Sequence, residues 1–270
     1  MITGSGGRLG RLLRAATRLS DPVGYEILFQ SRASDTDICW SPGDPLDAFP
    51  KCDLIVALWG RTDGDERALA QNSDLIDISR DVARQCDADR VAHMSSAAVY
   101  GPGEDLTEDA TLSPVNPYGA AKCAMEAHIA QTHDPGGPQD IVLRLANVIG
   151  ADSLAPALKG TKPVHLDRFG DGHGPRRSYL GATDLLRVIL KMTNAQAVPK
   201  VLNVASVASV GMEDIARAAG KDITWQPAPE TAVQNVTLDI SKLIAACPGL
   251  SRTGTAADLV ADWHALEDAS

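Results

Sequence analysis

Short apolar segments alternate with longer amphipathic segments along most of the chain. The apolar segments are rich in Val, Ile and Leu, have the length of strands, and occupy Tyr25–Gln30, Leu54–Leu58, Arg90–Met94, Ile141–Leu145 and Val201–Val204. The segments with helical periodicity are Leu9–Leu19, Glu66–Cys86 and Pro117–Thr132. Strands without a polar face are typical of sheets that are buried on both sides, and their alternation with helices is typical of βαβ units. The pattern predicts an α/β fold with a doubly wound parallel sheet.

The texture of the sequence changes after Gly150. Residues 151–177 are rich in Gly, Pro and basic side chains, which predicts a loop-rich insertion, whereas Thr255–Glu267 has the pattern of a closing amphipathic helix. We therefore expect a first domain over residues 1–150 that takes back about residues 178–205. Residues 151–177 and 206–270 are expected to form a small C-terminal lobe that includes the closing helix.

Composition and charge restrict the classes of protein to which the chain can belong. Its 270 residues, 44% of them hydrophobic and 22% charged, suffice for a large buried core. The formal net charge of −10 disfavours binding to nucleic acid or to anionic membranes. No apolar run reaches membrane-spanning length, and nothing near Met1 resembles a secretion signal, so we expect a cytoplasmic protein. The five cysteines lack metal-ligand spacing or a disulfide framework, which favours reduced core thiols and no metal.

A glycine-rich segment opens the chain. Glycines at positions 4, 7 and 10 lie between a short apolar start and a helix, with Arg8 and Leu9 between the last two of them. Such spacing permits a tight turn, a close approach of the backbone to a pyrophosphate, and tight packing of helix on strand. Gly4, Gly7 and Gly10 therefore predict a dinucleotide site in a Rossmann-type fold. Only three residues precede Gly4, which is short for a central strand, and we expect the true start of the protein to lie upstream.

A second set of residues suits proton transfer. Tyr118 and Lys122 are four residues apart, so that on a helix they project from the same face. A neighbouring ammonium and an oxidised nicotinamide would lower the pKa of a phenol and make it a better base. Ser95 and Ser96 follow a buried-strand pattern, at the sheet edge where ligands bind in this architecture. The alternative role of such a serine is a hydrogen bond to backbone at the end of the strand, which we expect for Ser95.

Taken together, these segments resemble the extended short-chain dehydrogenase/reductase family, of the NAD-dependent epimerase/dehydratase type that modifies nucleotide sugars. The resemblance runs over nearly the whole chain, through the segments 3–10, 53–60, 96–101, 118–122, 144–150, 169–172 and 177–184. It implies that Ser96 polarises the reacting carbonyl or hydroxyl and that Tyr118 is the general acid/base. Lys122 would bind the nicotinamide ribose, and Asn72 would support the proton relay as a further catalytic residue.

The resemblance also assigns binding residues. Besides the glycines, Arg8, Leu9, Tyr118 and Lys122, it places Leu58 and Asp44 at the cofactor, with Asp44 facing the adenine. Substrate contacts are implied for Ser96, Ala97, Asn147 and Arg177, of which Arg177 falls where relatives hold a diphosphate. The predicted helices Glu66–Cys86 and Pro117–Thr132 pair across a two-fold axis in the family, so we expect a homodimer.

One departure from the family pattern narrows the reaction. Members that dehydrate sugars carry an acidic pair just after the serine, whereas this chain has Ala97 and Ala98, which cannot move a proton. We therefore expect an NAD(P)-dependent oxidoreductase or epimerase that acts by hydride transfer on a sugar, with a nucleoside-diphosphate sugar favoured. The alternatives are a dehydrogenase of sugar acids such as uronates, another small carbonyl reductase, and a non-catalytic NADP-binding regulator.

Charges near the expected binding sites indicate the form of the ligands. The strand Tyr25–Gln30 is followed by Arg32 and lacks the acid that normally binds the NAD ribose, which favours NADP while leaving NAD possible. Residues 159–177 carry five basic and two acidic side chains in a protein of net charge −10. A solvated loop would explain this cluster, but its expected place over the sheet edge predicts an anionic substrate gripped by Arg177.

Overall fold

A parallel sheet occupies the centre of the computed structural model, which describes residues 1–60, 66–249 and 254–269. Its strand order is β1-β4-β5-β7-β11. The strands are β1 (Ile2–Thr3), β4 (Leu54–Ala57), β5 (Arg90–Ser96), β7 (Gln139–Leu145) and β11 (Val201–Val204). At its edge, the parallel pair β2 (Gln30–Ser31) and β3 (Ile38–Cys39) adjoins β1 through a bridge between Ile2 and Phe29. The predicted α/β class and the doubly wound parallel sheet are confirmed.

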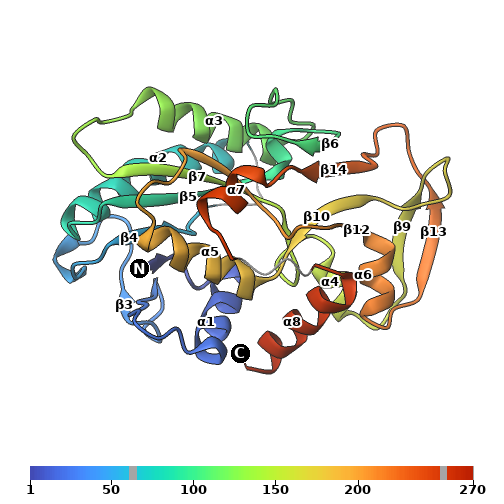
Figure 1. Cartoon of the computed structure of the whole chain (residues 1–270), viewed down its shortest axis with the longest axis horizontal. Coiled ribbons are helices and arrows are strands. Elements are labelled where there is room, and N and C mark those ends of the chain that lie inside the picture. Colours follow the sequence, from blue (N-terminus) through green and yellow to red (C-terminus); the bar gives the residue numbers. More distant parts are fainter. Residues whose placement is uncertain (61–65, 250–253, 270) are drawn as a thin grey trace.

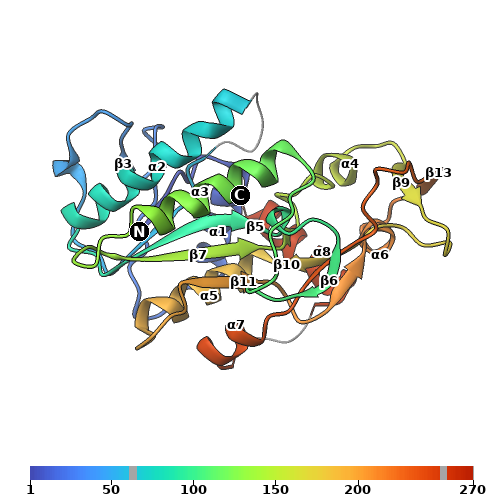
Figure 2. The same ribbon diagram turned by 90° about the horizontal axis from the view of Figure 1, so that it is seen from above.

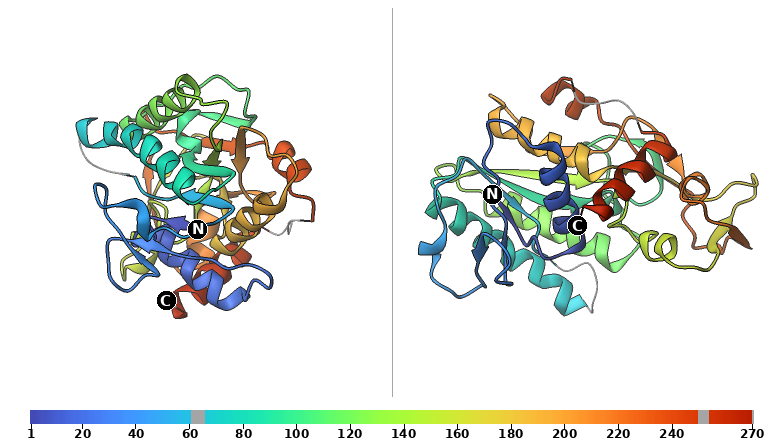
Figure 3. Two further views of the ribbon diagram at one scale, coloured as in Figure 1. Left: turned by 90° about the vertical axis from the view of Figure 1, so that its left-hand side faces the viewer. Right: turned by 90° about the horizontal axis from the view of Figure 1, so that it is seen from below.

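Helices cover both faces of this sheet (Figure 1). The helices α1 (Arg8–Ser20) and α5 (Ala182–Asn194) pack together on one face, and α2 (Glu66–Gln85) and α3 (Pro117–Gln131) pack together on the other. Figure 2 shows α3 above β5 and β7. The C-terminal helix α8 (Ala256–Asp268) lies beside α1, as the right-hand view of Figure 3 shows. It begins with a reciprocal capping box between Thr255 and Asp258.

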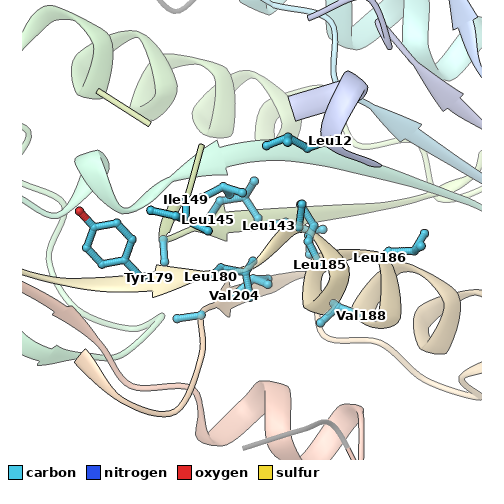
Figure 4. Packing of buried hydrophobic residues seen from close by; sticks show 14 of the residues in the cluster. Leu12, Leu143, Leu145, Ile149, Tyr179, Leu180, Leu185, Leu186, Val188 and Val204 are labelled. Atoms are coloured by element: carbon cyan, nitrogen blue, oxygen red, sulfur yellow. The ribbon is translucent and has the colours of Figure 1, made fainter. Parts of the chain in front are cut away.

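The face of the sheet that meets α1 and α5 is apolar. Leu143 of β7 packs with Leu12 of α1 and with Leu185 of α5, and all three side chains are at most 3% exposed (Figure 4). Burying an aliphatic side chain of this size contributes on the order of 1.5–3 kcal/mol. This cluster continues into the C-terminal region through Tyr179 and Trp263, so that one core holds both parts of the chain together.

A second, mixed sheet forms beyond the carboxyl ends of the central strands, on the right in Figure 1. Its order is β12-β10-β14-β6, and β8 also pairs with β10. Its strands are β6 (Gly103–Leu106), β8 (Asn147–Val148), β10 (Arg176–Leu180), β12 (Ser209–Gly211) and β14 (Asn235–Leu238). The other elements here are α4 (Ala155–Lys159), β9 (Val164–Arg168), which pairs with β13 (Ile223–Pro227), α6 (Met212–Ala218) and α7 (Ser241–Ala246).

The predicted loop-rich segment holds short elements, and one predicted strand is wrong in its extent. Residues 151–177 are loop-rich, with 12 of their 27 residues in α4, β9 and the first two positions of β10. The strand predicted at Tyr25–Gln30 is reduced to Gln30–Ser31. The neighbouring strand β1 has only two residues. Two backbone hydrogen bonds link the start of the chain to this segment, from the N–H of Ile2 to the carbonyl of Leu28 and from the N–H of Ser5 to the carbonyl of Gln30. No helix in the described part of the chain is long and apolar enough to cross a bilayer.

Candidate active site

The glycine loop joins β1 to the N-terminus of α1. Gly4 has a φ of +68°, and a Cβ there would lie 2.5 Å from the backbone nitrogen of Trp59. At Gly10 a Cβ would lie 2.4 Å from the Cα of Ser5, so both positions require glycine. Gly7 is the N-cap of α1 and has no side chain with which to cap the helix. A Cβ added at Gly7 would have only the carbonyl oxygen of Gly4 near it, at 3.7 Å. The loop therefore presents helix N–H groups to a bound anion, as a pyrophosphate requires.

The other predicted cofactor residues surround this loop to different degrees. Arg8 is exposed in the first turn of α1, and the half-buried Leu58 donates its N–H to the carbonyl of Thr3 beside the loop. Arg32 is exposed directly after β2. Asp44 uses its carboxylate to accept the N–H of Ser41 at 2.8 Å, which closes a turn, and its contact with an adenine stays a prediction.

Ser96 and Tyr118 meet where β5 ends and α3 begins. Ser96 is the last residue of β5 and accepts the N–H of Ala98 at 3.2 Å. Asn116 caps α3 by accepting the N–H of Gly119, and a Cβ on Gly119 would lie 2.3 Å from the carbonyl oxygen of Ala98. This close packing brings Tyr118, the second residue of α3, to the end of β5. Burial raises the pKa of Tyr118, although the nearby Ser96 side chain opposes the rise.

Lys122 lies one helical turn beyond Tyr118 and is 6% exposed. Its ammonium donates to the carbonyl oxygen of Met94 at 2.6 Å and lies 5.9 Å from the centre of the Tyr118 ring. Burial lowers the pKa of Lys122 to about 8, against the opposing charge of Glu126. The raised pKa of Tyr118 shows that this ammonium alone does not produce the lowering expected from the sequence. The positive charge of an oxidised nicotinamide would have to supply it.

A buried ion pair, which the sequence analysis missed, anchors the end of β5 behind these residues. Glu126 of α3 accepts hydrogen bonds from Ser95 at 2.5 Å and from Arg144 of β7 at 2.7 Å. Arg144 also donates to the hydroxyl of Tyr100 at 2.8 Å. Ser95 therefore bonds to a side chain rather than to backbone as we expected. A signal was available, because Glu126 lies one turn after Lys122 on the same helix face.

A second buried charge cluster lies deeper under α2 and α3. His93 of β5 shares a hydrogen bond of 2.8 Å between its Nε2 and a carboxylate oxygen of Asp140, and Arg80 of α2 donates to the same carboxylate at 2.8 Å. Asn72 of α2 is 3% exposed and lines a small cavity together with His93 and Lys122. The structure thus brings the four predicted catalytic residues into one region, and places His93 there as well.

The basic side chains of residues 159–177 do not converge on one point. Arg177 donates to the carbonyl oxygens of Arg176, Val233 and Gln234 at 2.6 to 2.8 Å, and burial lowers the pKa of its guanidinium. Other side chains of this group contact different partners, among them Lys159 with Glu267, Arg168 with Trp225, and Arg176 with Ser209. The anion site at Arg177 stays a prediction. Asn147 pairs with Tyr179 between β8 and β10, and Ala97 is buried after Ser96.

Comparison with known proteins gives a consistent set of matches. The family model of the NAD dependent epimerase/dehydratase family matches residues 1–205. The dTDP-6-deoxy-L-talose 4-dehydrogenase (NAD(P)(+)) of Kitasatospora kifunensis is 26% identical over 85% of this chain and 82% of its own. The UDP-glucose 4-epimerase of Azospirillum brasilense is 42% identical, but this match covers only 24% of the chain and 19% of that relative. The structure of MoeE5 in complex with UDP-glucuronic acid and NAD superposes with a TM-score of 0.78 at 18% identity, covering 100% of this chain and 99% of that one.

Proposed function

Because the chain belongs to the NAD dependent epimerase/dehydratase family, we propose that it moves hydride between a nicotinamide cofactor and a carbon of a nucleoside-diphosphate sugar. One observation carries this proposal. Ser96 ends β5 and Tyr118 begins α3 close enough to it for Ser96 to influence the pKa of the phenol, and the ammonium of Lys122 lies 5.9 Å from the centre of the Tyr118 ring. The carboxyl ends of parallel strands are where open α/β sheets bind their ligands.

Each of these residues has a distinct role in the proposed reaction. Ser96 donates a hydrogen bond to the oxygen on the reacting carbon, and Tyr118 removes or returns the proton of that oxygen. Lys122 keeps a positive charge close to the phenol, which favours its ionised form. When bound, the nicotinamide supplies the hydride chemistry, and the glycine loop with the N-terminus of α1 would hold its pyrophosphate.

The residues after Ser96 favour redox chemistry or epimerisation over elimination of water. Ala97 is the first residue of a short 3-10 helix, and Ala97 and Ala98 carry no group that moves a proton. Two of the relatives carry names that correspond to these two reactions, since one is a 4-dehydrogenase of a dTDP sugar and the other is a 4-epimerase of a UDP sugar. We therefore place the reaction at a ring carbon that carries a hydroxyl or a keto group.

A sugar-acid dehydrogenase is the second candidate. The MoeE5 complex contains UDP-glucuronic acid, in which a nucleotide and a carboxylate occur in one ligand. Arg177 in this chain suits either anion, because a guanidinium binds phosphate and carboxylate through the same pair of parallel hydrogen bonds. It would have to exchange its bonds to the carbonyl oxygens of Val233 and Gln234 for such a ligand.

The cofactor is proposed to be NADP in preference to NAD, although the matched family is named for NAD. Arg32 is exposed directly after β2, where the strand ends without an acid at the expected place, and its guanidinium suits a 2′-phosphate. The Kitasatospora relative carries NAD(P)(+) in its name. Arg32→Glu should move the preference toward NAD. Tighter binding of NAD than of NADP by the unaltered protein, measured by titration, would contradict the proposal.

A homodimer in the cytoplasm is proposed as the working form of the enzyme. The helices α2 and α3 lie side by side on one face of the sheet, where an isologous contact between two copies would bury them together. Light scattering at micromolar concentration should report twice the chain mass of 28.4 kDa. A monomer would contradict this part of the proposal and would leave the proposed reaction to be tested separately.

The decisive experiment is a matrix of both oxidised and both reduced cofactors against UDP and dTDP sugars, UDP-uronates and free uronic acids. Absorbance of reduced nicotinamide reports net oxidation or reduction, and NMR of the sugar reports epimerisation without net redox change. Tyr118→Phe is the matched control, because it removes only the hydroxyl. Turnover of a nucleotide sugar that disappears in this variant would support the proposal. Turnover of free uronates alone would favour the second candidate, and cofactor binding without any turnover would favour a regulator.

A further inference from the structure

A small cavity lies directly beneath Lys122, between β5 and the helices α2 and α3. Its volume is about 10 Å³, which is close to the lower limit for one ordered water molecule. It is lined by Ala57, Trp59, Asn72, Leu75, Ile76, Ser79, His93, Met94, Lys122 and Met125. A water in such a place needs two to four polar partners, so the polar groups in this lining decide what it can hold.

His93 offers one such partner in a fixed orientation. Although burial raises the pKa of Asp140, its hydrogen bonds with His93 and Arg80 outweigh this effect and lower the pKa to about 2, so Asp140 is an anion. A carboxylate only accepts hydrogen bonds, so the proton of the neutral imidazole must be on Nε2. Burial lowers the pKa of His93 and outweighs the opposing effect of the Asp140 charge. The ring is therefore neutral, and its Nδ1 is a hydrogen-bond acceptor.

This acceptor is costly unless something binds to it. Nδ1 of His93 is buried and finds no hydrogen-bond partner among the residues that the structure describes. Leaving a buried polar atom in that condition costs free energy, because the atom has lost its hydrogen bonds to water and gained none in return. The other polar lining groups are already occupied where their bonds are known: Trp59 donates to Ser79 at 2.8 Å, and Ser79 donates to the carbonyl of Leu75 at 2.6 Å.

Lys122 offers the complementary group across the same cavity. An ammonium has three N–H donors. The carbonyl oxygen of Met94 takes one of them at 2.6 Å, and the sulfur of Met125, a weak acceptor, lies 3.7 Å away. The charge of Lys122 is also one of the influences on the pKa of His93, which places the two groups within electrostatic reach.

We propose that this cavity binds one water molecule that accepts a hydrogen bond from Lys122 and donates one to Nδ1 of His93. His93, oriented by Asp140 and Arg80, is then a positioning residue that holds the ammonium of Lys122 toward Tyr118. The importance of this for catalysis rests on the proposed function, whereas the water and its two bonds do not. The other charged groups around Lys122 are Glu126 on its own helix, with Arg144 of β7 paired to it.

The test uses the chain without added cofactor, so its result is independent of any turnover. A crystal structure should show one water within hydrogen-bond distance of both Nδ1 of His93 and Nζ of Lys122. NMR of labelled histidine should find His93 neutral with its proton on Nε2. NMR of labelled lysine should find that His93→Phe lowers the pKa of Lys122 by about half a unit or more, because the ammonium loses the bond to water.

Two further variants keep the result interpretable. Val142 lies directly opposite His93 in the β5–β7 ladder, and Val142→Ala removes packing there without removing a polar group. It should leave the Lys122 titration unchanged, whereas His93→Asn, which retains an acceptor, should restore part of the shift. A structure of the unaltered protein without the water would overturn the proposal even if His93→Phe failed to fold. An unchanged Lys122 pKa in His93→Phe, or an equal shift in Val142→Ala, would overturn it too.

Discussion

Replacing Asp140 by Asn should weaken the protein in a way that depends on pH. Asp140 is buried between His93 and Arg80, and its pKa falls from 3.8 to about 2 in the folded chain. A lowering of this size corresponds to about 2 kcal/mol of stability. Because the pKa is lower in the folded state, this stability is complete above the unfolded value of 3.8 and is lost as the pH falls through about 2. At pH 6 the variant should be less stable by about 3–5 kcal/mol, since Arg80 loses its buried partner and keeps only its longer pair with the exposed Asp77.

Urea unfolding of both proteins at pH 6 and near pH 2 measures this effect as a difference. The difference in unfolding free energy between the unaltered protein and Asp140→Asn should be smaller by about 2 kcal/mol near pH 2 than at pH 6. Asp81→Asn, which removes a carboxylate from an exposed pair with Arg84, should change stability by less than about 1 kcal/mol at either pH. A difference for Asp140→Asn that does not change with pH would refute the reasoning.

Three further outcomes follow from the geometry of the site. Tyr118→Phe should lower turnover by about 10²–10⁴ while cofactor affinity in a fluorescence titration stays nearly unchanged, and residual activity above about a tenth would contradict its role. Gly10→Ala should abolish folding or cofactor binding, because its Cβ meets the backbone of Ser5 at 2.4 Å, whereas Gly6→Ala, with 3.7 Å of clearance, should melt like the unaltered protein. Arg177→Ala should raise KM for the substrate by the equivalent of about 2–5 kcal/mol, and an unchanged KM would remove the anion site.

The sheet and its large helices could be predicted because their signals are local. The helix predicted at Leu9–Leu19 extends by one residue at each end in the structure, and Val201–Val204 is reproduced without change. In both segments the spacing of the apolar residues and the length of the run can be recognised in the sequence alone. The strands of the C-terminal region lack this property. Residues Val164–Arg168 alternate buried and exposed positions and acquire their partner only at Ile223–Pro227, far along the chain. No local pattern in residues 151–177 specifies that pairing.

The site shows the same division between local and distant signals. Tyr118 and Lys122 were found because a helix places them one turn apart, and Ser96 because it ends a strand. The partners of the buried charges come from different elements, and only the folded sheet brings them together. Arg80 lies on α2 and Asp140 on β7, so neither predicts the other. The sequence predicted a lowered pKa for Tyr118, whereas burial raises it. Burial is a property of the whole fold, so no local pattern could predict this effect.

The distribution of these charges across the sheet links stability to chemistry. Along β5 and β7, alternate side chains turn to opposite faces, and Ser95 lies opposite Arg144 on the face toward α3. Ile141 and Leu143, the alternate residues of β7, join the apolar core toward α1 and α5. Buried ion pairs add little net stability relative to apolar packing, and losing one partner is expensive. These ion pairs are concentrated on the face of the sheet that α3, the helix of Lys122, covers. Their location therefore argues that they position side chains of the site, while the opposite face supplies the apolar packing that stabilises the sheet.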